Sequence, residues 1–187
     1  MNDAGELLTV RGADREREIG GIIDVAMRKM GRPAVLFEDI PGYKKGFRVV
    51  SNLFTSVKRI ALSLGLPGNT SEVELVRYWR DYMKNAPTIP PKEVNHGPLL
   101  DNTFKGDDIN LLSIPTPRWH EGDGGYYMGT GCLVIMQDPD SGWINYGCYR
   151  VQVHDRKVAS IMISKGKHGD ILMRKYHDKG KPCPIAV

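Results

Sequence analysis

Cysteine is scarce in this sequence, and long apolar runs are missing from it. The three cysteines, Cys132, Cys148 and Cys183, are odd in number and too far apart to form a CxxC site. We therefore expect free thiols that pack as small apolar side chains in a reducing compartment. No apolar run approaches the length of a membrane-spanning helix, and the first residues have no apolar signal-peptide core. These absences predict a cytoplasmic protein with no membrane partner.

The sequence also lacks the short motifs of several enzyme classes. It contains no P-loop, no GxSxG elbow, no HExxH pair and no GxGxxG turn after a strand. Its formal net charge is only +4, and acidic residues lie near the two basic concentrations at 43–48 and 165–181. Such a pattern is typical of a solvated face and predicts no nucleic-acid partner. The second concentration can nevertheless attract an anion such as a phosphate.

What is present is the composition of a soluble globular protein, with 41% hydrophobic and 26% charged residues in 187 positions. Strand and helix patterns alternate over residues 1–86, which predicts an N-terminal α/β domain. Gly31 and Gly65 are typical helix stops. The expected strands are 6–10, 33–40 and 47–53, and the expected helices are 15–31, 55–65 and 71–85.

The composition changes after residue 86. Six prolines between 87 and 117 exclude a regular helix and predict an extended linker over this stretch. Within 118–187, turn residues separate β patterns at 131–138, 143–153 and 158–164, which predicts a meander or a partial barrel. A last helix is expected over 170–180, and the closing PCPIAV segment begins like a strand.

Asn145 and Arg150 are unusual residues for a strand that only packs. Because they are five residues apart, they are expected on opposite faces of the strand, unless a bulge at Gly147 reorients one of them. Gly147 also allows a flat ligand to approach the backbone closely. In the structural alternative, Asn145 satisfies a neighbouring backbone group and Arg150 pairs with a surface acid. The spacing alone favours the structural alternative.

Two histidines are further candidates. His168 follows Lys167 just before a predicted helix, where a helix N-terminus is suited to a phosphate or carboxylate. The imidazole can instead bind a divalent metal, and the structural alternative is an exposed turn histidine. His120 lies in a glycine-rich stretch with two acids at 118–129, which favours a mobile loop over a ligand rather than a metal site.

Three long stretches together resemble one enzyme family. They are LFEDIPGYKKGFRVVSNLF, IPTPRWHEGDGGYYMGTGCLVIMQDPDSGWINYGCYRVQVHD and ISKGKHGDILMRKYHDKGKPCPIAV. In this order and without gaps, they closely resemble the UbiD-type decarboxylases, which use prenylated FMN. The resemblance covers nearly the whole chain. It implies an α/β (α+β) fold in which an N-terminal α/β domain is followed by the first part of a flavin-binding split β-barrel.

The resemblance also implies a cofactor and metal site. Asn145 in the W-x-N strand and His168 in the turn before a helix match family ligands of a divalent metal that bridges to the flavin phosphate. Mn²⁺ or Mg²⁺ suits oxygen and nitrogen ligands of this kind, and K⁺ is a further candidate ion. Lys167, beside the histidine, is implied as a contact of the cofactor.

A second group of residues is implied at the reacting face of the flavin. Arg150 matches a family active-site arginine whose planar guanidinium suits a substrate carboxylate. Cys148 and Tyr149 would line the flavin with their backbone. The implied reaction is the reversible decarboxylation of an aromatic acid of the hydroxybenzoate type, or of an α,β-unsaturated acid, with CO₂ as the other partner. A flavin prenyltransferase would supply the cofactor, which carries the difficult chemistry.

Some family features are expected outside this sequence. The third metal ligand of the family, a glutamate, and its proton-donating glutamates lie beyond the position of Val187. The resemblance therefore predicts a fragment that is inactive alone, with a homo-oligomer expected for the full-length form. The alternative is a non-catalytic module that binds prenylated FMN, or a subunit of a multi-chain (de)carboxylase.

Overall fold

The computed structural model describes residues 1–187, and they form two compact units. Unit 1 comprises Met1–Ala13 and Gly21–Ile109, and unit 2 comprises Asp14–Gly20 and Asn110–Val187. The last change of unit, between Ile109 and Asn110, falls inside the proline-rich stretch. The expected domain bounds at 86 and 117 stay predictions. None of the helices has the length and apolar character that crossing a membrane requires.

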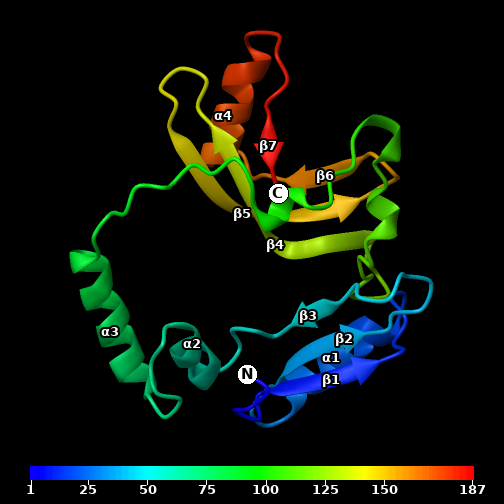
Figure 1. The fold of residues 1–187 in the computed structure, drawn as a ribbon, viewed down its shortest axis with the longest axis vertical. Helices are drawn as coiled ribbons and strands as arrows, with labels where there is room; N and C mark the ends of the chain where they lie inside the picture. Colours follow the sequence, from blue (N-terminus) through cyan, green and yellow to red (C-terminus); the bar gives the residue numbers. More distant parts are fainter. The chain divides into compact units, whose positions relative to one another are not determined.

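Unit 1 contains a three-stranded mixed sheet of order β1-β2-β3 (Figure 1). β1 (Leu7–Arg11) and β2 (Ala34–Glu38) are parallel and are connected through α1 (Glu18–Arg28), and β3 (Val49–Ser51) is antiparallel to β2. Because β2 is the central strand, its residues Ala34, Val35 and Phe37 have no exposed surface. The alternating strand and helix patterns of the sequence thus predicted these elements correctly.

Two helices follow β3 and begin at capping residues. Ser56 precedes α2 (Val57–Ser63), and its side chain accepts a hydrogen bond from the backbone N–H of Arg59. Ser71 and Glu74 form a capping box at the start of α3 (Glu72–Asn85). The proline-rich stretch that comes next contains no α-helix. It has three short 3₁₀ turns, at Pro98–Leu100, Gly106–Asp108 and Leu111–Ser113.

A fully buried arginine connects several segments of unit 1. Arg59 has no exposed surface. Its guanidinium donates hydrogen bonds to the Glu6 carboxylate at 2.7 Å and to the Thr55 hydroxyl at 2.7 Å. It also donates to the backbone carbonyl oxygens of Arg32 at 2.6 Å and Leu53 at 3.2 Å. The charge is therefore surrounded by acceptors from distant parts of the chain, which is the condition for burying it.

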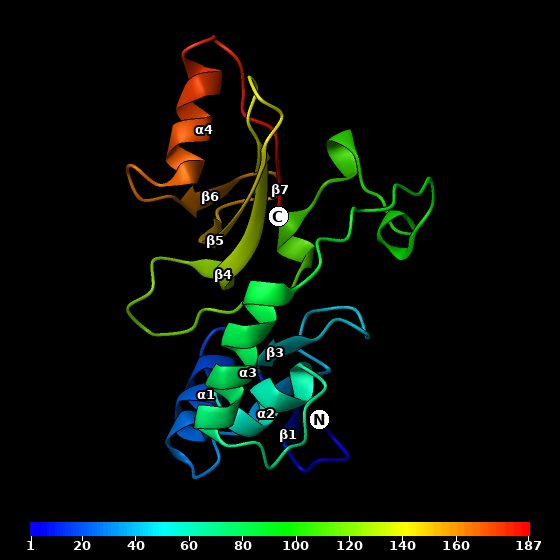
Figure 2. The same cartoon turned by 90° about the vertical axis from the view of Figure 1, so that its left-hand side faces the viewer.

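Unit 2 is a curled antiparallel sheet of order β6-β5-β4-β7, with one helix packed on it (Figures 1 and 2). The elements are β4 (Tyr126–Gln137), β5 (Ile144–Val153), β6 (Ala159–Met162), α4 (His168–His177) and β7 (Ile185–Ala186). β4, β5 and β6 form the expected meander, and β7 pairs with the other edge of β4. The fold is thus mixed α/β with a half-barrel, as expected.

The core of unit 2 lies between the sheet and α4. Val134 and Met136 from β4, Val151 from β5 and Leu172 from α4 are buried together. Their alternation along each strand follows the two-residue period of a sheet with one covered face. This packing fixes the first turn of α4 beside β5, where the candidate residues lie.

Candidate functional site

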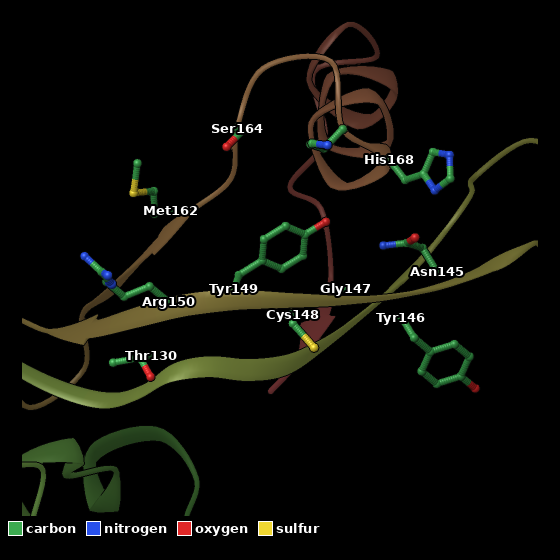
Figure 3. Close-up of a pocket in the computed structure, with 11 residues that line it drawn as sticks. Thr130, Asn145, Tyr146, Gly147, Cys148, Tyr149, Arg150, Met162, Ser164 and His168 are labelled. Carbon is green, nitrogen blue, oxygen red and sulfur yellow. The ribbon is translucent and has the colours of Figure 1, made fainter. Parts of the chain in front are cut away.

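A cavity of about 550 Å³ in unit 2 brings together all the predicted site residues. Its walls come from β4, β5, the end of β6 and the start of α4 (Figure 3). The lining residues are Thr130, Asn145, Tyr146, Gly147, Cys148, Tyr149, Arg150, Met162, Ser164, Lys167 and His168.

The cavity follows an edge of β5 that no strand covers. β6 pairs with β5 only over Arg150–Val153, so residues 144–149 have β4 on one side and no strand on the other. After β6 the chain passes through Ser164 and enters α4, whose first residue lies over this edge (Figure 3). A ligand at the edge can therefore meet backbone, side chains and a helix N-terminus at once.

There is no bulge at Gly147, which was the exception that could have reoriented Asn145 or Arg150. β5 pairs with β4 in continuous register through Gly147, and the register shifts lie in β4, on both sides of Gly129. Regular alternation therefore leaves Asn145 and Arg150 on opposite faces of β5. They still line one cavity, because a cavity at an open strand edge can be reached from both faces.

Asn145 is a buried amide with an unpartnered nitrogen. The residue is 5% exposed, and its Nδ2 has no hydrogen-bond partner. The amide nitrogen thus does not satisfy a neighbouring backbone group, as the structural alternative required. An unsatisfied buried donor costs roughly 1–3 kcal/mol. By rotation of its amide, this side chain can offer N–H groups to an anion or its oxygen to a cation.

His168 is the first residue of α4, so the helix begins two residues earlier than expected. The imidazole is exposed, and the Trp143 ring lies edge-on to it, with a centroid distance of 5.2 Å and an interplanar angle of 88°. The Asp170 carboxylate accepts the backbone N–H of Gly166 at 2.8 Å and Nε of Arg174 at 3.0 Å. These two donors lower the pKa of Asp170 and order the turn that carries His168.

Arg150 has a free charge at the other end of the cavity. It is exposed and forms no ion pair, so the surface pairing of the structural alternative is not made. Its guanidinium carbon lies 5.7 Å from the ring centroid of Tyr127 on β4, a distance at which a cation is attracted to an aromatic face. The guanidinium is therefore available to an anionic ligand.

The cysteines are all free, as predicted, but one of them is not packed. Cys148 is exposed and lines the cavity, whereas Cys132 and Cys183 are half-buried. Burial raises the pKa of the Cys132 and Cys183 thiols. Cys148 and Tyr146 point away from the side on which Asn145 and Tyr149 point (Figure 3).

The acidic Asp123 of the glycine-rich stretch at 118–129 bonds backbone within its own loop. The Asp123 carboxylate accepts the backbone N–H groups of Trp119 at 3.2 Å and His120 at 3.0 Å, so it closes the loop on itself. No cluster of three or more histidine, cysteine or acidic side chains in the structure could hold a metal ion. Asn145 and His168 are suitable donors for a hard cation, but a complete coordination shell needs further ligands.

A second hollow of about 530 Å³ lies in unit 1, at the ends of β1 and β2. Its charged residues have both signs, and Arg11 is paired there with Glu38 at 3.3 Å and with Asp39 at 3.8 Å. Lys45 and Arg48, from the first basic concentration, are exposed on its rim. None of the predicted site residues lies in this hollow.

Sequence reasoning missed several lining residues, of which Thr130 and Ser164 are polar. Thr130 stands between Gly129 and Gly131, where the register of β4 shifts. Glycines on both sides of a strand residue are a signal of irregular pairing, so this residue could have been suspected. Ser164 has no comparable signal, because its position depends on where β6 ends.

Comparison with known proteins gives matches over nearly the whole chain. Residues 1–79 match the 3-octaprenyl-4-hydroxybenzoate carboxy-lyase N-terminal domain, and residues 92–187 match the 3-octaprenyl-4-hydroxybenzoate carboxy-lyase Rift-related domain. A phenolic acid decarboxylase of Escherichia coli O157:H7 is 32% identical over 197 residues, which cover 100% of this chain and 40% of that protein.

Solved structures that are similar to this chain also belong to decarboxylases and UbiD-class enzymes. The vanillic acid decarboxylase of Sedimentibacter hydroxybenzoicus in closed form matches with a TM-score of 0.89 and 32% identity, covering 98% of this chain and 40% of that one. An evolved dimeric form of the UbiD-class enzyme HmfF from Pelotomaculum thermopropionicum, in complex with prFMN, matches with a TM-score of 0.82 and 27% identity, covering 98% and 41%. The chain thus spans about 40% of the length of these relatives.

Proposed function

This chain belongs to the UbiD family of carboxy-lyases, and we propose that it provides the prenylated-FMN site of a reversible, non-oxidative decarboxylase of aromatic acids. The observation that carries the proposal is the cavity along the open edge of β5. It gathers the six residues of this chain that the family resemblance assigns to cofactor, metal or substrate, namely Asn145, Cys148, Tyr149, Arg150, Lys167 and His168. A structural relative of this chain was solved with prFMN, which supports the choice of cofactor.

The phosphate end of the cofactor is assigned to the junction of β5 and α4. Asn145 and His168 line this end together, and Lys167 adds a positive charge beside the N-terminus of α4. The orphaned amide of Asn145 fits a ligand that carries oxygen atoms or a cation. A divalent metal, Mn²⁺ or Mg²⁺, would take Asn145 and His168 as ligands and the phosphate as another. K⁺ remains a further candidate ion.

The flat part of the cofactor is assigned to the middle of β5. Cys148 and Tyr149 form the wall there, and the Tyr149 ring occupies the space that a side chain at Gly147 would fill. When bound, the prenylated flavin would supply the electrophilic group that accepts the electrons of the carbon losing CO₂. The residues of the chain orient the acid against this group and limit the access of water.

The substrate carboxylate is assigned to Arg150. Its guanidinium is unpaired and is held near the Tyr127 ring, so it can form two parallel hydrogen bonds with a carboxylate. The relatives of Escherichia coli and Sedimentibacter hydroxybenzoicus act on phenolic acids and vanillic acid, respectively. These names favour a hydroxybenzoate-type acid over an α,β-unsaturated one. CO₂ would be the second product or substrate.

The proposal is tested by cofactor content after co-expression with a flavin prenyltransferase. The chain is purified and denatured, and released prenylated FMN and metal are measured by mass spectrometry. We expect both in the wild type, and a loss of metal and most cofactor in His168→Ala. His154→Ala is the matched control, because His154 is exposed and lies outside the cavity, where it bonds Ser160. A wild-type chain that retains neither prenylated FMN nor metal would contradict the proposal.

A non-catalytic role remains a second candidate, since the chain spans about 40% of its relatives. A prenylated-FMN-binding module, or a subunit of a multi-chain decarboxylase, predicts the same cofactor content. Turnover of a hydroxybenzoate-type acid separates the two roles. In an active assembly, Arg150→Ala should abolish decarboxylation without loss of folding, and Arg150→Lys should restore only part of it. Near-normal turnover in Arg150→Ala would remove this residue from the site.

A further inference from the structure

Tyr149 fills a gap between β5 and the first turn of α4. It lies on the same face of β5 as Asn145 and Val151, the face that α4 covers, and it packs against the buried core of unit 2. Its ring points from the strand toward α4, between the two walls of the cavity (Figure 3). No hydrogen bond holds its hydroxyl, so its position is set by packing.

The Tyr149 ring lies close to Gly147. A Cβ atom added to Gly147 would be 2.3 Å from Cε2 and 2.5 Å from Cζ of Tyr149. Carbon atoms in proteins do not approach this closely without displacement, because the repulsion at such distances is steep. A side chain at position 147 would therefore displace the Tyr149 ring.

The hydroxyl end of the same ring also meets a second glycine. A Cβ atom added to Gly169, the second residue of α4, would be 2.6 Å from Oη and 3.1 Å from Cζ of Tyr149. Gly169 is buried and directly follows His168. One side chain thus spans the whole distance from strand to helix, and a glycine on each element makes the room for it.

We propose that Tyr149 is a positioning residue, a spacer that sets the separation of the β5 and α4 walls so that Asn145 and His168 act on one ligand. The role rests on the proposed function, because it concerns the same cofactor site. Without the ring, the first turn of α4 would move toward the strand, and the cavity end that holds the phosphate would narrow. The hydroxyl itself takes no part in the ligand contact.

Two glycine variants test the spacer geometry without any ligand. Gly169→Ala places its methyl against Oη, so Tyr149→Phe removes the shorter contact and leaves the one at 3.1 Å. Gly147→Ala places its methyl against the ring carbons, so Tyr149→Phe leaves that clash in place. In urea unfolding, the Phe background should therefore restore the midpoint of Gly169→Ala but not that of Gly147→Ala. Equal rescue of both variants, or of neither, would overturn the spacer.

Binding of FMN tests what the spacer does for the site. We expect Tyr149→Ala to weaken FMN binding by about tenfold or more, as loss of a supporting residue around a metal or phosphate group typically does. Tyr149→Phe keeps the ring and should therefore retain more FMN affinity than Tyr149→Ala. Val151→Ala is the matched control, since Val151 lies on the same face of β5 and in the same core but not in the cavity.

The outcomes distinguish a failure of the positioning role of Tyr149 from a failure of the proposed cofactor site. If Tyr149→Ala binds FMN as well as the wild type, or if folded Val151→Ala binds it equally weakly, the positioning role is wrong. If the wild type itself binds no FMN, the proposed function fails and the ligand role of the spacer fails with it. The glycine variants still decide the packing part in that case.

Discussion

Arg59 in unit 1 and Asn145 in unit 2 are both buried polar side chains, but they differ in their hydrogen-bond partners. In unit 1, the Arg59 guanidinium has a carboxylate, a hydroxyl and backbone carbonyl oxygens as acceptors. In unit 2, the Nδ2 atom of Asn145 has no partner, although the residue is only 5% exposed. Buried polar groups are nearly always paired. The difference shows that the surroundings of Arg59 serve the fold, and it supports the ligand role proposed for Asn145.

The largest effect on the free energy of unfolding is expected when Arg59 is replaced. Arg59→Ala leaves the Glu6 carboxylate without its buried partner, and breaking a buried pair in this way costs about 3–5 kcal/mol. Lys58→Ala is the matched control, because Lys58 pairs with the same carboxylate at 3.0 Å but is 42% exposed. Its loss should cost less than about 1 kcal/mol. The free energies of unfolding in urea test both values, and similar losses would mean that Arg59 is not the structural centre of unit 1.

For Asn145 we expect the opposite result, which is a small change in stability and a large loss of FMN binding. Asn145→Ala removes an unsatisfied donor, so the free energy of unfolding should change by less than about 1 kcal/mol or rise. FMN binding should fall by about tenfold or more, because the amide is one of the groups facing the phosphate end. Gln152→Ala is the control, since this amide of the same strand already bonds the Gly124 carbonyl outside the cavity. A large loss of stability with intact FMN binding would reverse the comparison.

The smallest effect is expected for the ion pair between Asp138 and Lys175, which involves neither Arg59 nor Asn145. The Lys175 ammonium and the backbone N–H of Asp140 lower the pKa of Asp138 from 3.8 to about 2. Because the folded-state pKa is the lower one, the pair adds stability above pH 3.8, and this stability is lost as the pH falls through about 2. Asp138→Asn should therefore flatten the acid dependence of urea unfolding below about pH 4. An unchanged pH profile would show that the pair does not stabilise unit 2.

Most elements of the fold could be predicted from local signals. Periodic apolar residues predict the helices and strands. Capping serines precede α2 and α3, and Gly31 and Gly65, with positive φ values, follow helices. All these signals depend on residues that are close in sequence. The start of α4 was missed, because a glycine at 169 is a poor helix former. In the structure the Asp170 carboxylate orders the preceding turn, and the helix begins at His168.

The candidate site was less accessible to sequence reasoning. Spacing alone favoured a structural role for Asn145 and Arg150, and only the resemblance to a family placed them in one site. The physical reason that they meet is the open edge of β5, which depends on where β6 stops pairing. Such pairing is a tertiary property that no local pattern records. The glycines at 147 and 169 were visible in the sequence, but their common partner Tyr149 was not.

The cavity is also built from one short part of the chain. All its lining residues lie between Thr130 and His168, on consecutive elements joined by short connections. Contacts between residues that are close in sequence have a small loop-closure entropy, and chains rich in such contacts fold quickly. Because domains form as units during synthesis, we expect the cavity along β5 to be in place as soon as α4 has emerged from the ribosome.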